Sequence, residues 1–448
     1  MKTTAIILAA GKGTRMKSAL PKPLHPVGGR PMLAWALDAA MASGAEQCIT
    51  VLPKDSAATQ EWLGDAPVAI QDPPLGTGHA VIATETRLKH FDGVALVMFA
   101  DTPLVTAGTL KQLCILIRDG NDVGVLGFDA EDPNGYGRLI TNDNGHVEAI
   151  IEHNDASDEQ RDITLVNGGI MAIRCPLLFD MLAQITPNNT KGELYLTDIV
   201  AIAHASGHSV KALVTDESEV MGVNDRVDLA VAEALLQDRL RMAALEAGVT
   251  MHAPETVFLH ADAIIESDVT IEPHVVIGQG CHIGEGSVLR AFSHLEGAIL
   301  GKCCIIGPYA RLRPGTVAAE GVKIGNFVET KNAELGAGAK ANHLSYLGDA
   351  EVGAAANIGA GTITCNYDGH NKYKTLIGDG AFIGSNTALV APVSIGANAI
   401  IGAGSTITKD IENNDIGLSR SPIDIRKGAA PKLHKRNAAI KAAKSKKS

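Results

Sequence analysis

The sequence is poor in aromatic residues and lacks both an excess of positive charge and a long apolar run. Phe, Trp and Tyr make up 4% of its 448 residues, and the formal net charge is −11. The negative balance argues against nucleic acid as a general partner. No apolar run approaches the ~18 residues of a membrane-spanning helix, and no signal-peptide pattern follows Met1. We therefore expect a soluble cytoplasmic protein without a membrane span.

The cysteines argue against two kinds of site. There are seven, an odd number, and no two of them have C-x-x-C spacing. A disulfide framework or a zinc site is therefore not expected, and a reducing compartment fits. The 46% of hydrophobic residues is enough for sizeable cores. The length predicts two or three domains at roughly 100–200 residues each.

Short apolar strands alternate with helical stretches in residues 1 to about 225. This alternation predicts an α/β domain with a mostly parallel sheet that is covered on both faces. Ligands of such sheets bind beyond the carboxyl ends of the strands. The expected strands are Ile6–Ala10, Cys48–Leu52, Val94–Phe99, Val123–Phe128 and Gly169–Ile173. The expected helices are Pro31–Ser43, Ala80–Lys89 and Thr106–Arg118.

A long helix is expected from Asn224 to Gly248. Apolar residues recur there at helical spacing, and Gly248 suits the C-cap. The helix is either a rigid connector between domains or a part of the first domain. At the other end of the chain, residues 426–448 hold nine Lys and Arg residues and no acid. They predict a mobile, solvated basic extension, and phosphate binding is the alternative.

From about residue 250 aliphatic residues recur every six positions. This period matches a hexapeptide parallel β-helix, in which each hexapeptide forms one side of a triangular coil. Two long series are Ile265, Ile271, Ile277, Ile283, Leu289 and Leu295, and then Ile377, Ile383, Leu389, Ile395, Ile401 and Ile407. The repeat breaks between Thr364 and Ile377. The polar segment Cys365–Lys374 is therefore expected to form a surface loop, and such loops often lie on the binding face.

A glycine-rich segment follows the first expected strand. Its sequence, Gly11-Lys12-Gly13-Thr14-Arg15-Met16, fails both the dinucleotide fingerprint and the P-loop pattern. The glycines still let backbone N–H groups approach an anion, and Lys12 and Arg15 supply positive charge. Lys22, between two prolines, adds a cation on a stiff segment. An ordinary tight turn is the alternative explanation.

Several motifs taken together resemble one family. Leu8–Met16, then Leu20–Leu24, resembles the signature of sugar-nucleotide pyrophosphorylases. Leu75–Ala80 resembles their base- and sugar-binding loop, and Ala100–Leu104 their metal-aspartate motif. Gly135-Tyr136-Gly137-Arg138, Glu152, Asn167-Gly168-Gly169 and Gly222-Val223-Asn224 follow in the expected order. With the hexapeptide half, residues 3 to about 425 resemble the bacterial bifunctional N-acetylglucosamine-1-phosphate uridyltransferases/glucosamine-1-phosphate N-acetyltransferases.

The resemblance implies a domain order and two reactions. Residues 1–225 would form a Rossmann-like nucleotidyltransferase domain, 226–249 a linker helix, 250–425 a left-handed β-helix acetyltransferase domain and 426–448 a basic tail. Acetyl-CoA would acetylate glucosamine 1-phosphate. UTP would then react with N-acetylglucosamine 1-phosphate, with release of pyrophosphate, to give UDP-N-acetylglucosamine, a precursor for peptidoglycan and lipopolysaccharide. The resemblance also implies Mg²⁺ and a homotrimer, because related β-helices pack as trimers.

For uridyl transfer the resemblance implies a set of site residues. Asp101 and Asn224 would hold Mg²⁺, with Asn224 also among the substrate-binding residues, while Arg15 and Lys22 would stabilise charge on the phosphates. The others are Leu8, Ala10 and Gly11 for the nucleotide, Gln71, Gly76 and Thr77 for uracil, and Gly137, Glu152 and Asn167 for the sugar. A helix N-cap is the alternative role for Asp101 and for Asn224. Ala100 stands where many members carry glycine, so its methyl group is expected to crowd the ligand.

For acetyl transfer the resemblance makes His343 the general base. A neutral imidazole can take a proton from an amine as the amine attacks a thioester. Glu329 is expected to orient His343. The expected sugar-phosphate ligands are Arg313, Lys331, Tyr346, Asn357 and Lys372. The expected acetyl-CoA contacts are Ala360, Asn366, Tyr367, Ser385, Ala403 and Arg420.

Three rival interpretations remain open at this point. The first is a monofunctional nucleotidyltransferase whose β-helix oligomerises or binds an effector. The second is a non-enzymatic scaffold that keeps both folds. The third is a β-helix zinc hydrase built on some of His274, His282, His294 and His343, although their intervals define no single ligand set.

Overall fold

The computed structural model describes residues 1–11 and 13–445, and only the backbone of residues 444 and 445. Lys12 of the expected phosphate loop and residues 446–448 of the basic tail lie outside the described residues. The chain divides into two compact units. The first comprises residues 1–244 and 259–261, and the second comprises residues 245–258 and the chain from Asp262 onward. The four functional segments expected from the sequence stay a prediction.

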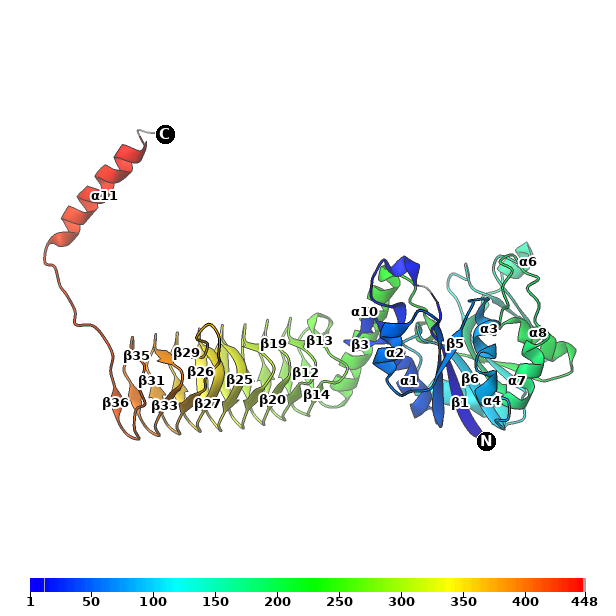
Figure 1. Cartoon of the computed structure of the whole chain (residues 1–448), viewed down its shortest axis with the longest axis horizontal. Coiled ribbons are helices and arrows are strands. Elements are labelled where there is room, and N and C mark those ends of the chain that lie inside the picture. The colour runs from blue at the N-terminus through cyan, green and yellow to red at the C-terminus, as the bar shows by residue number, and fades with distance from the viewer. Residues whose placement is uncertain (12, 446–448) are drawn as a thin grey trace. The chain divides into compact units, whose positions relative to one another are not determined.

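A nine-stranded sheet with helices on both faces forms the first unit (Figure 1). Its main strand order is β11-β7-β10-β6-β1-β4-β5, and β8 and β9 extend it beside β10. Along this path β1 is parallel to β4 and β6, β4 to β5, and β7 to β11, whereas only β10 is antiparallel to its neighbours β6 and β7, so the main path is parallel-rich. The strands are β1 (Lys2–Leu8), β4 (Gln47–Pro53), β5 (Val68–Gln71), β6 (Gly93–Phe99), β7 (Val123–Asp129), β8 (Arg138–Thr141), β9 (Val147–Ile151), β10 (Leu165–Arg174) and β11 (Val210–Val214). The five strands expected from the sequence are confirmed, but β1 and β10 each begin four residues earlier than expected, and β1 ends at Leu8 rather than Ala10.

Side chains of the central strands point alternately to the two faces of the sheet, and they pack into one core on each face. Ile6 of β1 packs with α3, α4, α7 and α8 on one face, and Ile7 packs with α1 and α5 on the other. The expected helix Ala80–Lys89 is wrong in one respect, because it is two short helices, α3 and α4. Thr84 lies buried between them and its hydroxyl donates to the carbonyl of Val81. The helices are α1 (Met32–Ala42), α2 (Ala57–Leu63), α3 (Thr77–Ile82), α4 (Glu85–Leu88), α5 (Ala107–Arg118), α6 (Asp158–Arg161), α7 (Cys175–Leu182), α8 (Asp198–Ala205) and α9 (Glu217–Val220).

The long helix α10 (Arg226–Glu246) packs on the first unit. Its Ala232 and Leu236 share a small core with Val27, Met32 and Leu104. The first unit also contains the short 3-10 turns η1 (Thr14–Met16) and η2 (Lys22–Leu24) and the hairpin strands β2 (Pro26–Val27) and β3 (Arg30–Pro31). Throughout the described chain, every helix is too short or too polar to span a bilayer.

Stacked coils of short parallel strands form the second unit (Figure 1). Thr270, Val288, Ile305, Lys323 and Lys340 pair in turn, so they occupy equivalent positions in successive coils. Their spacing along the chain is 18 or 17 residues, close to the three hexapeptides of each coil in a left-handed hexapeptide β-helix. The inward aliphatic residues of the repeat are buried, except the half-buried Ile265 at the start. This core confirms the fold expected from the six-residue period.

The three faces of the coil are made of short parallel strands. One face is a ten-stranded sheet of β12 (Thr250–Met251), β15 (Thr270–Ile271), β18 (Val288–Leu289), β21 (Ile305–Ile306), β24 (Lys323–Asn326), β26 (Lys340–His343), β28 (Asn357–Ile358), β31 (Phe382–Ile383), β34 (Ile400–Ile401) and β36 (Ile416–Gly417). The other two faces contain β13 (Phe258–Leu259), β14 (Ile264–Ile265), β16 (Val276–Ile277), β17 (His282–Ile283), β19 (His294–Leu295), β20 (Ala298–Leu300), β22 (Arg311–Leu312), β23 (Thr316–Ala318), β25 (Glu329–Leu335), β27 (Tyr346–Val352), β29 (Ile363–Cys365), β30 (Thr375–Ile377), β32 (Ala388–Val390), β33 (Val393–Ile395) and β35 (Thr406–Ile407). A 3-10 turn, η3 (Pro254–Thr256), stands near the start of the unit.

One coil carries the expected insertion. Asn357 pairs with Phe382, so the stretch between these equivalent positions exceeds an ordinary coil by more than one hexapeptide. The extra chain forms a loop over residues 366–374, while Cys365 still belongs to β29. In the tail, residues 429–445 form the exposed helix α11 (Ala429–Ser445), so this part is regular where the sequence predicted only a solvated extension.

Two candidate active sites

The first candidate site lies where β1 and β6 end side by side. Leu8 and Phe99 are the last residues paired between these parallel strands, and the N–H of Ala100 donates to the carbonyl of Leu8 at 3.0 Å. From β1 the chain continues to β4 on one side, and β6 lies on the other side. α/β sheets leave a crevice for ligands at such a reversal of strand order. A pocket of about 470 Å³ opens at this edge.

Four side chains expected to act on phosphates and metal meet at this edge. The ammonium group of Lys22 makes an ion pair with Asp101 and donates to Asn224 Oδ1 at 3.1 Å. Arg15 Nη2 donates to the same oxygen at 2.9 Å. The side chains of Lys22 and Asp101 are only 11% and 26% exposed. Salt therefore screens this ion pair less than it screens exposed charges.

Neither Asp101 nor Asn224 caps a helix. Thr106 caps α5, because its hydroxyl accepts from the N–H of Thr109. Asp225 holds the first turn of α10 by accepting from the N–H groups of Val227 and Asp228. The N-cap alternative is therefore wrong for both residues, and their side-chain oxygens face cations instead.

The residues expected from the resemblance to contact the nucleotide all line this pocket, and their role stays a prediction. Gly76 has φ of +112°, and a Cβ there would lie 2.5 Å from the carbonyl oxygen of Leu194, so the position requires glycine. The Gln71 side chain donates to the Gly76 carbonyl at 2.9 Å and fixes this turn. Ala100 also lines the pocket, and its effect on a ligand stays a prediction. The expected residues that line the pocket are Leu8, Ala10, Gly11, Lys22, Gln71, Gly76, Thr77 and Asp101.

The three expected sugar residues form a neighbouring group that does not line this pocket. The N–H of Asn167 donates to the carbonyl of Gly137 at 2.8 Å. A Cβ on Gly137 would lie 3.6 Å from Glu152 Oε1, so the glycine faces that carboxylate. Glu152 in turn accepts from the hydroxyl of Thr197 at 3.1 Å. Burial, helped by the charges of Glu152 and Asp155, raises the pKa of the adjacent Asp198 to about 6.

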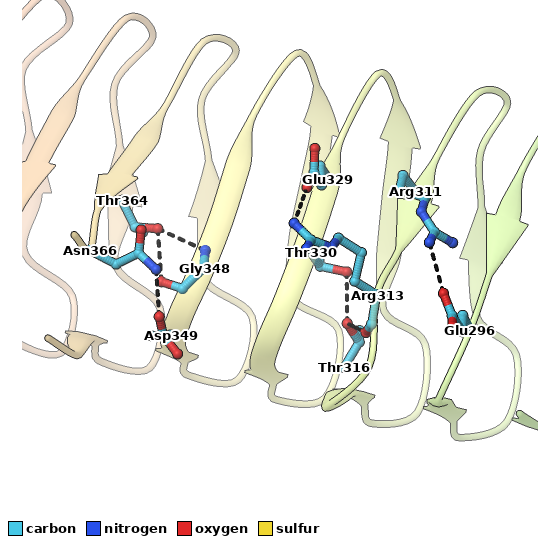
Figure 2. Close-up of polar contacts among 10 residues, drawn as sticks. All are labelled: Glu296, Arg311, Arg313, Thr316, Glu329, Thr330, Gly348, Asp349, Thr364 and Asn366. Atoms are coloured by element: carbon cyan, nitrogen blue, oxygen red, sulfur yellow. Dashed lines mark hydrogen bonds and ion pairs between the residues drawn. The ribbon is translucent and has the colours of Figure 1, made fainter. Parts of the chain in front are cut away.

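In the second unit, the three cations expected to bind the sugar phosphate belong to one group. Arg313 follows β22, Lys331 lies on β25, and Lys372 belongs to the inserted loop. Contact with Lys372, together with burial and the charge of Arg313, lowers the pKa of Lys331. Arg313 also donates to Glu329 Oε1 at 2.8 Å (Figure 2). Such a gathering of like charges is suited to an anionic ligand.

The base of the inserted loop is fixed beside these cations. Asn366, which is 8% exposed, donates to Asp349 (Figure 2). Hydrogen bonds from Asn332 and Asn366 and the charges of Lys372 and Lys331 outweigh burial and lower the pKa of Asp349. Asp349 therefore stays ionised and ties the loop to the coil below it. The Tyr346 ring lies where a Cβ of Gly348 would be, so this glycine makes room for the ring.

His343 lies at the end of β26, on a different face from the cations. It lines a pocket of about 230 Å³ with Arg290, Lys323 and Asn326 among others. Its Nδ1 is 2.7 Å from Asn326 Oδ1. Because an amide oxygen only accepts, Nδ1 carries the proton and Nε2 is left free to accept one. The expectation that Glu329 orients His343 is wrong, since Glu329 pairs with Arg313 instead.

Three of the residues expected to contact acetyl-CoA follow one corner of the coils. The N–H of Asn386 donates to Ala360, and the N–H of Gly404 donates to Ser385, so Ala360, Ser385 and Ala403 lie on successive coils. A Cβ on Gly402 would lie 3.6 Å from Arg420 Nη2, which places Arg420 against the last of them. Asn357 lies on β28, next to β26, while Tyr367 projects from the inserted loop and is 60% exposed. Among the described residues, no hydrogen bond or ion pair joins His343 to Arg313, Lys331 or Lys372.

The histidines do not support a zinc site. His274 stacks on Phe292, with ring centroids 4.8 Å apart, and His282 pairs with Glu266 at 2.9 Å. In the part of the chain that the structure describes, no group of three or more His, Cys, Asp or Glu side chains is placed to hold a metal ion. The zinc hydrase interpretation therefore finds no ligand set.

Comparison with known proteins matches both units. Residues 5–187 match the model of the MobA-like NTP transferase domain, and residues 256–291 and 374–409 match that of the bacterial transferase hexapeptide (six repeats). The bifunctional protein GlmU of Sphingopyxis alaskensis is 50% identical over 446 residues, 99% of each chain. That of Ruegeria sp. is 49% identical over 450 residues, all of each chain, and that of Bradyrhizobium sp. is 51% identical over 443 residues, 98% of each. The chain belongs to the GlmU family.

GlmU proteins are bifunctional transferases, and both transferase units of the family are present here. The family and its two domains imply a nucleotide, a sugar phosphate, acetyl-CoA and a metal. The expectations of a pure scaffold and of a monofunctional enzyme are therefore set aside. Sequence reasoning missed Asn326, although a signal exists: it occupies the position of His343 in the preceding coil.

Proposed function

We propose that this GlmU family member makes UDP-N-acetylglucosamine by acetylating glucosamine 1-phosphate in the β-helix unit and uridylating the product in the α/β unit. The observation that carries the proposal is the meeting of Arg15, Lys22, Asp101 and Asn224 at the edge of the 470 Å³ pocket. Both reactants of uridyl transfer are anions. Charge neutralisation and positioning are therefore the main requirements of this reaction.

The residues present fit Mg²⁺. Asp101 and Asn224 each contact the same Lys22 ammonium group, so their oxygens are close enough to share one small cation. Both are hard oxygen ligands, and Mg²⁺ in such sites takes its remaining ligands from water and substrate phosphates. When bound, the ion would neutralise charge on the phosphates of UTP.

In uridyl transfer, residues of the first unit bind and orient the two phosphate-bearing substrates, UTP and N-acetylglucosamine 1-phosphate. Gln71, Gly76 and Thr77 hold uracil, and the turn from Leu8 to Gly11 faces the nucleotide. A phosphate oxygen of N-acetylglucosamine 1-phosphate, held near Gly137, Glu152 and Asn167, forms a bond to the α-phosphorus of UTP. The bond from that phosphorus to the β-phosphate oxygen breaks, and pyrophosphate leaves. Arg15 and Lys22 stabilise the charge that develops during this exchange.

In acetyl transfer, His343 acts as the general base. Its Nε2 takes a proton from the amine of glucosamine 1-phosphate as the nitrogen attacks the thioester carbonyl. The carbon–sulfur bond breaks, and the leaving thiolate of coenzyme A takes this proton from the His343 imidazolium, so coenzyme A leaves as the thiol. Asn326 holds Nδ1–H, and Arg313, Lys331 and Lys372 bind the phosphate, with Tyr346 and Asn357 beside the sugar. Ala360, Asn366, Tyr367, Ser385, Ala403 and Arg420 contact acetyl-CoA.

We propose a homotrimer for two reasons. A stacked ladder of His274, Phe292, Tyr309 and Phe327 follows one corner of the coils, and the last three side chains are 49%, 48% and 56% exposed. An exposed apolar ridge of this kind is typical of a surface that another copy covers. In addition, among the described residues of one chain, His343 makes no hydrogen bond or ion pair with the cation group and lies on a different face of the coil. Multi-angle light scattering should give three times the 46.7 kDa chain mass; a monomer would refute the proposal.

UTP and acetyl-CoA as substrates favour the cytoplasm as the location of this protein.

Product analysis with omissions tests the function. Glucosamine 1-phosphate, acetyl-CoA, UTP and Mg²⁺ are supplied together, and UDP-N-acetylglucosamine is followed by chromatography. Omitting acetyl-CoA should abolish the product, and adding N-acetylglucosamine 1-phosphate should restore it. Unchanged product without acetyl-CoA would contradict the first half-reaction. Absence of product with N-acetylglucosamine 1-phosphate and UTP would contradict the second.

A further inference from the structure

A fully buried arginine lies next to the proposed sugar residues. Arg138 begins β8 and is 0% exposed. An arginine side chain stays charged at any physiological pH. Burial of a charge is costly unless it is paired and hydrogen-bonded. Within the described residues, however, no carboxylate makes an ion pair with Arg138, and its Nε has no partner.

The partners of Arg138 are neutral groups of the surrounding chain. Its Nη1 donates to the carbonyl of Tyr136 and lies 3.3 Å from His153 Nδ1. Its Nη2 donates to the carbonyl of Arg161 at 3.0 Å. The guanidinium therefore joins three segments that are separate in the sequence, at Tyr136, at His153 and at Arg161.

Two of these segments carry proposed sugar ligands. Tyr136 directly precedes Gly137, and His153 directly follows Glu152. A Cβ on Gly137 would lie 3.6 Å from Glu152 Oε1, so Gly137 faces the Glu152 carboxylate. The backbone of Arg138 also pairs with Val166, next to Asn167. One side chain thus holds the backbone carbonyl next to Gly137 and the ring of the residue next to Glu152, and its own backbone adjoins the third ligand.

We propose that Arg138 is a positioning residue for the sugar phosphate, which rests on the proposed role of Gly137 and Glu152 in binding it. The planar guanidinium group of Arg138 contacts the Tyr136 carbonyl and the His153 ring at the same time. It thereby fixes the separation of Gly137 and Glu152. A lysine keeps the charge but has no fork and cannot hold both partners in one plane. Because His153 Nδ1 accepts from an arginine N–H, the ring proton of His153 lies on Nε2.

The test compares ligands that differ only in the sugar. Binding of UDP and of UDP-N-acetylglucosamine is measured by calorimetry for the full-length protein and for Arg138→Lys. We expect UDP-N-acetylglucosamine to bind at least tenfold more weakly and UDP to bind within twofold of the wild type. The KM for N-acetylglucosamine 1-phosphate should rise while the KM for UTP stays. Equal weakening of both ligands, or no weakening of either in a folded variant, would overturn the proposal.

Three further variants keep the test decisive. His153→Ala removes one partner of the fork and should weaken UDP-N-acetylglucosamine in the same direction even if Arg138→Lys does not fold. His146→Ala, at an exposed position between β8 and β9, is the matched control and should change neither ligand. Acetyl transfer by the second unit serves as an internal measure of intact protein. Normal sugar binding by Glu152→Ala would refute the site itself, whereas weakened binding there with unchanged Arg138→Lys and His153→Ala would refute only the positioning role.

Discussion

Nδ1 of His343 lies 2.7 Å from the side-chain oxygen of Asn326, which occupies the equivalent position one coil earlier. The pair links two neighbouring strands, β24 and β26, so the coil itself sets the geometry. The amide oxygen leaves Nε2 of the imidazole as the proton acceptor. This contact gives the proposed base one defined tautomer.

Replacing this amide should therefore damage acetyl transfer alone. We expect Asn326→Ala to lower kcat for acetyl transfer by about 10–100-fold, as for other residues that orient a functional histidine. His343→Ala should lower it by about 10²–10⁴-fold. Asn398→Ala, an exposed asparagine at another corner, is the control. Equal loss of uridyl transfer in the same preparations would indicate misfolding and contradict the assignment.

Metal binding in the first unit should depend on Asp101 and compete with Lys22. The Lys22 ammonium group and a metal ion need the same two oxygens, so the Lys22→Met variant should bind Mn²⁺ more tightly than the wild type in the absence of nucleotide. Its rate of uridyl transfer should nevertheless fall at least 100-fold. Asp101→Asn should weaken Mn²⁺ binding, and chelation should stop uridyl transfer but spare acetyl transfer. Electron paramagnetic resonance of free Mn²⁺ measures the affinity. Lys2→Met, from an exposed ion pair with Glu46, is the control; weaker Mn²⁺ binding by Lys22→Met would contradict the competition.

Stability of the first unit should respond to Asp198 in a defined pH range. Burial, with the charges of Glu152 and Asp155, raises its pKa from 3.8 to about 6. The folded state thus binds this proton more tightly, and the free energy of unfolding falls as pH rises through that interval. Asp198→Asn removes the cost of ionisation, so it should raise the melting temperature at pH 7.5 relative to wild type. The gain should vanish near pH 3.8 and below; a gain independent of pH would contradict the cause given.

The inserted loop should matter to the sugar phosphate through one of its two lysines. Lys372 contacts Lys331, whereas Lys374 pairs with Glu351. Loss of one charge-assisted hydrogen bond costs about 1.5–3 kcal/mol, so Lys372→Met should raise the KM for glucosamine 1-phosphate roughly tenfold or more. Lys374→Met is the matched control and should leave this KM unchanged. Similar effects of the two variants would mean that the loop acts through its shape alone.

Much of the fold follows from periodicity. The six-residue repeat placed inward side chains such as Ile283 and Leu289, because each position meets the same environment in every coil. The strands β1 and β6 were predictable as buried apolar runs. The division of residues 77–88 into α3 and α4 was not, since it depends on the buried hydroxyl of Thr84 rather than on apolar spacing.

The residue types of the site could be predicted, but their partners could not. Motif order placed Lys22, Asp101 and Asn224 in one family pattern, yet the contacts of one ammonium group with both oxygens depend on how η2 and the start of α10 fold back to the sheet edge. Glu329, expected to orient His343, pairs with Arg313 instead. The coil register places Asn326 beside the imidazole, and this register is not visible in the family motif.

The inserted loop between β29 and β30 can differ between related enzymes without a change in the coils around it. The coil that bears it absorbs more than an extra hexapeptide relative to its neighbours, and the strands on either side of the insertion still pair in the same order. The length and sequence of the loop at that corner are thus independent of the strand pairing in the coils. A change in the loop can therefore alter the surroundings of Lys331, which Lys372 contacts, without any change in the register of the coils.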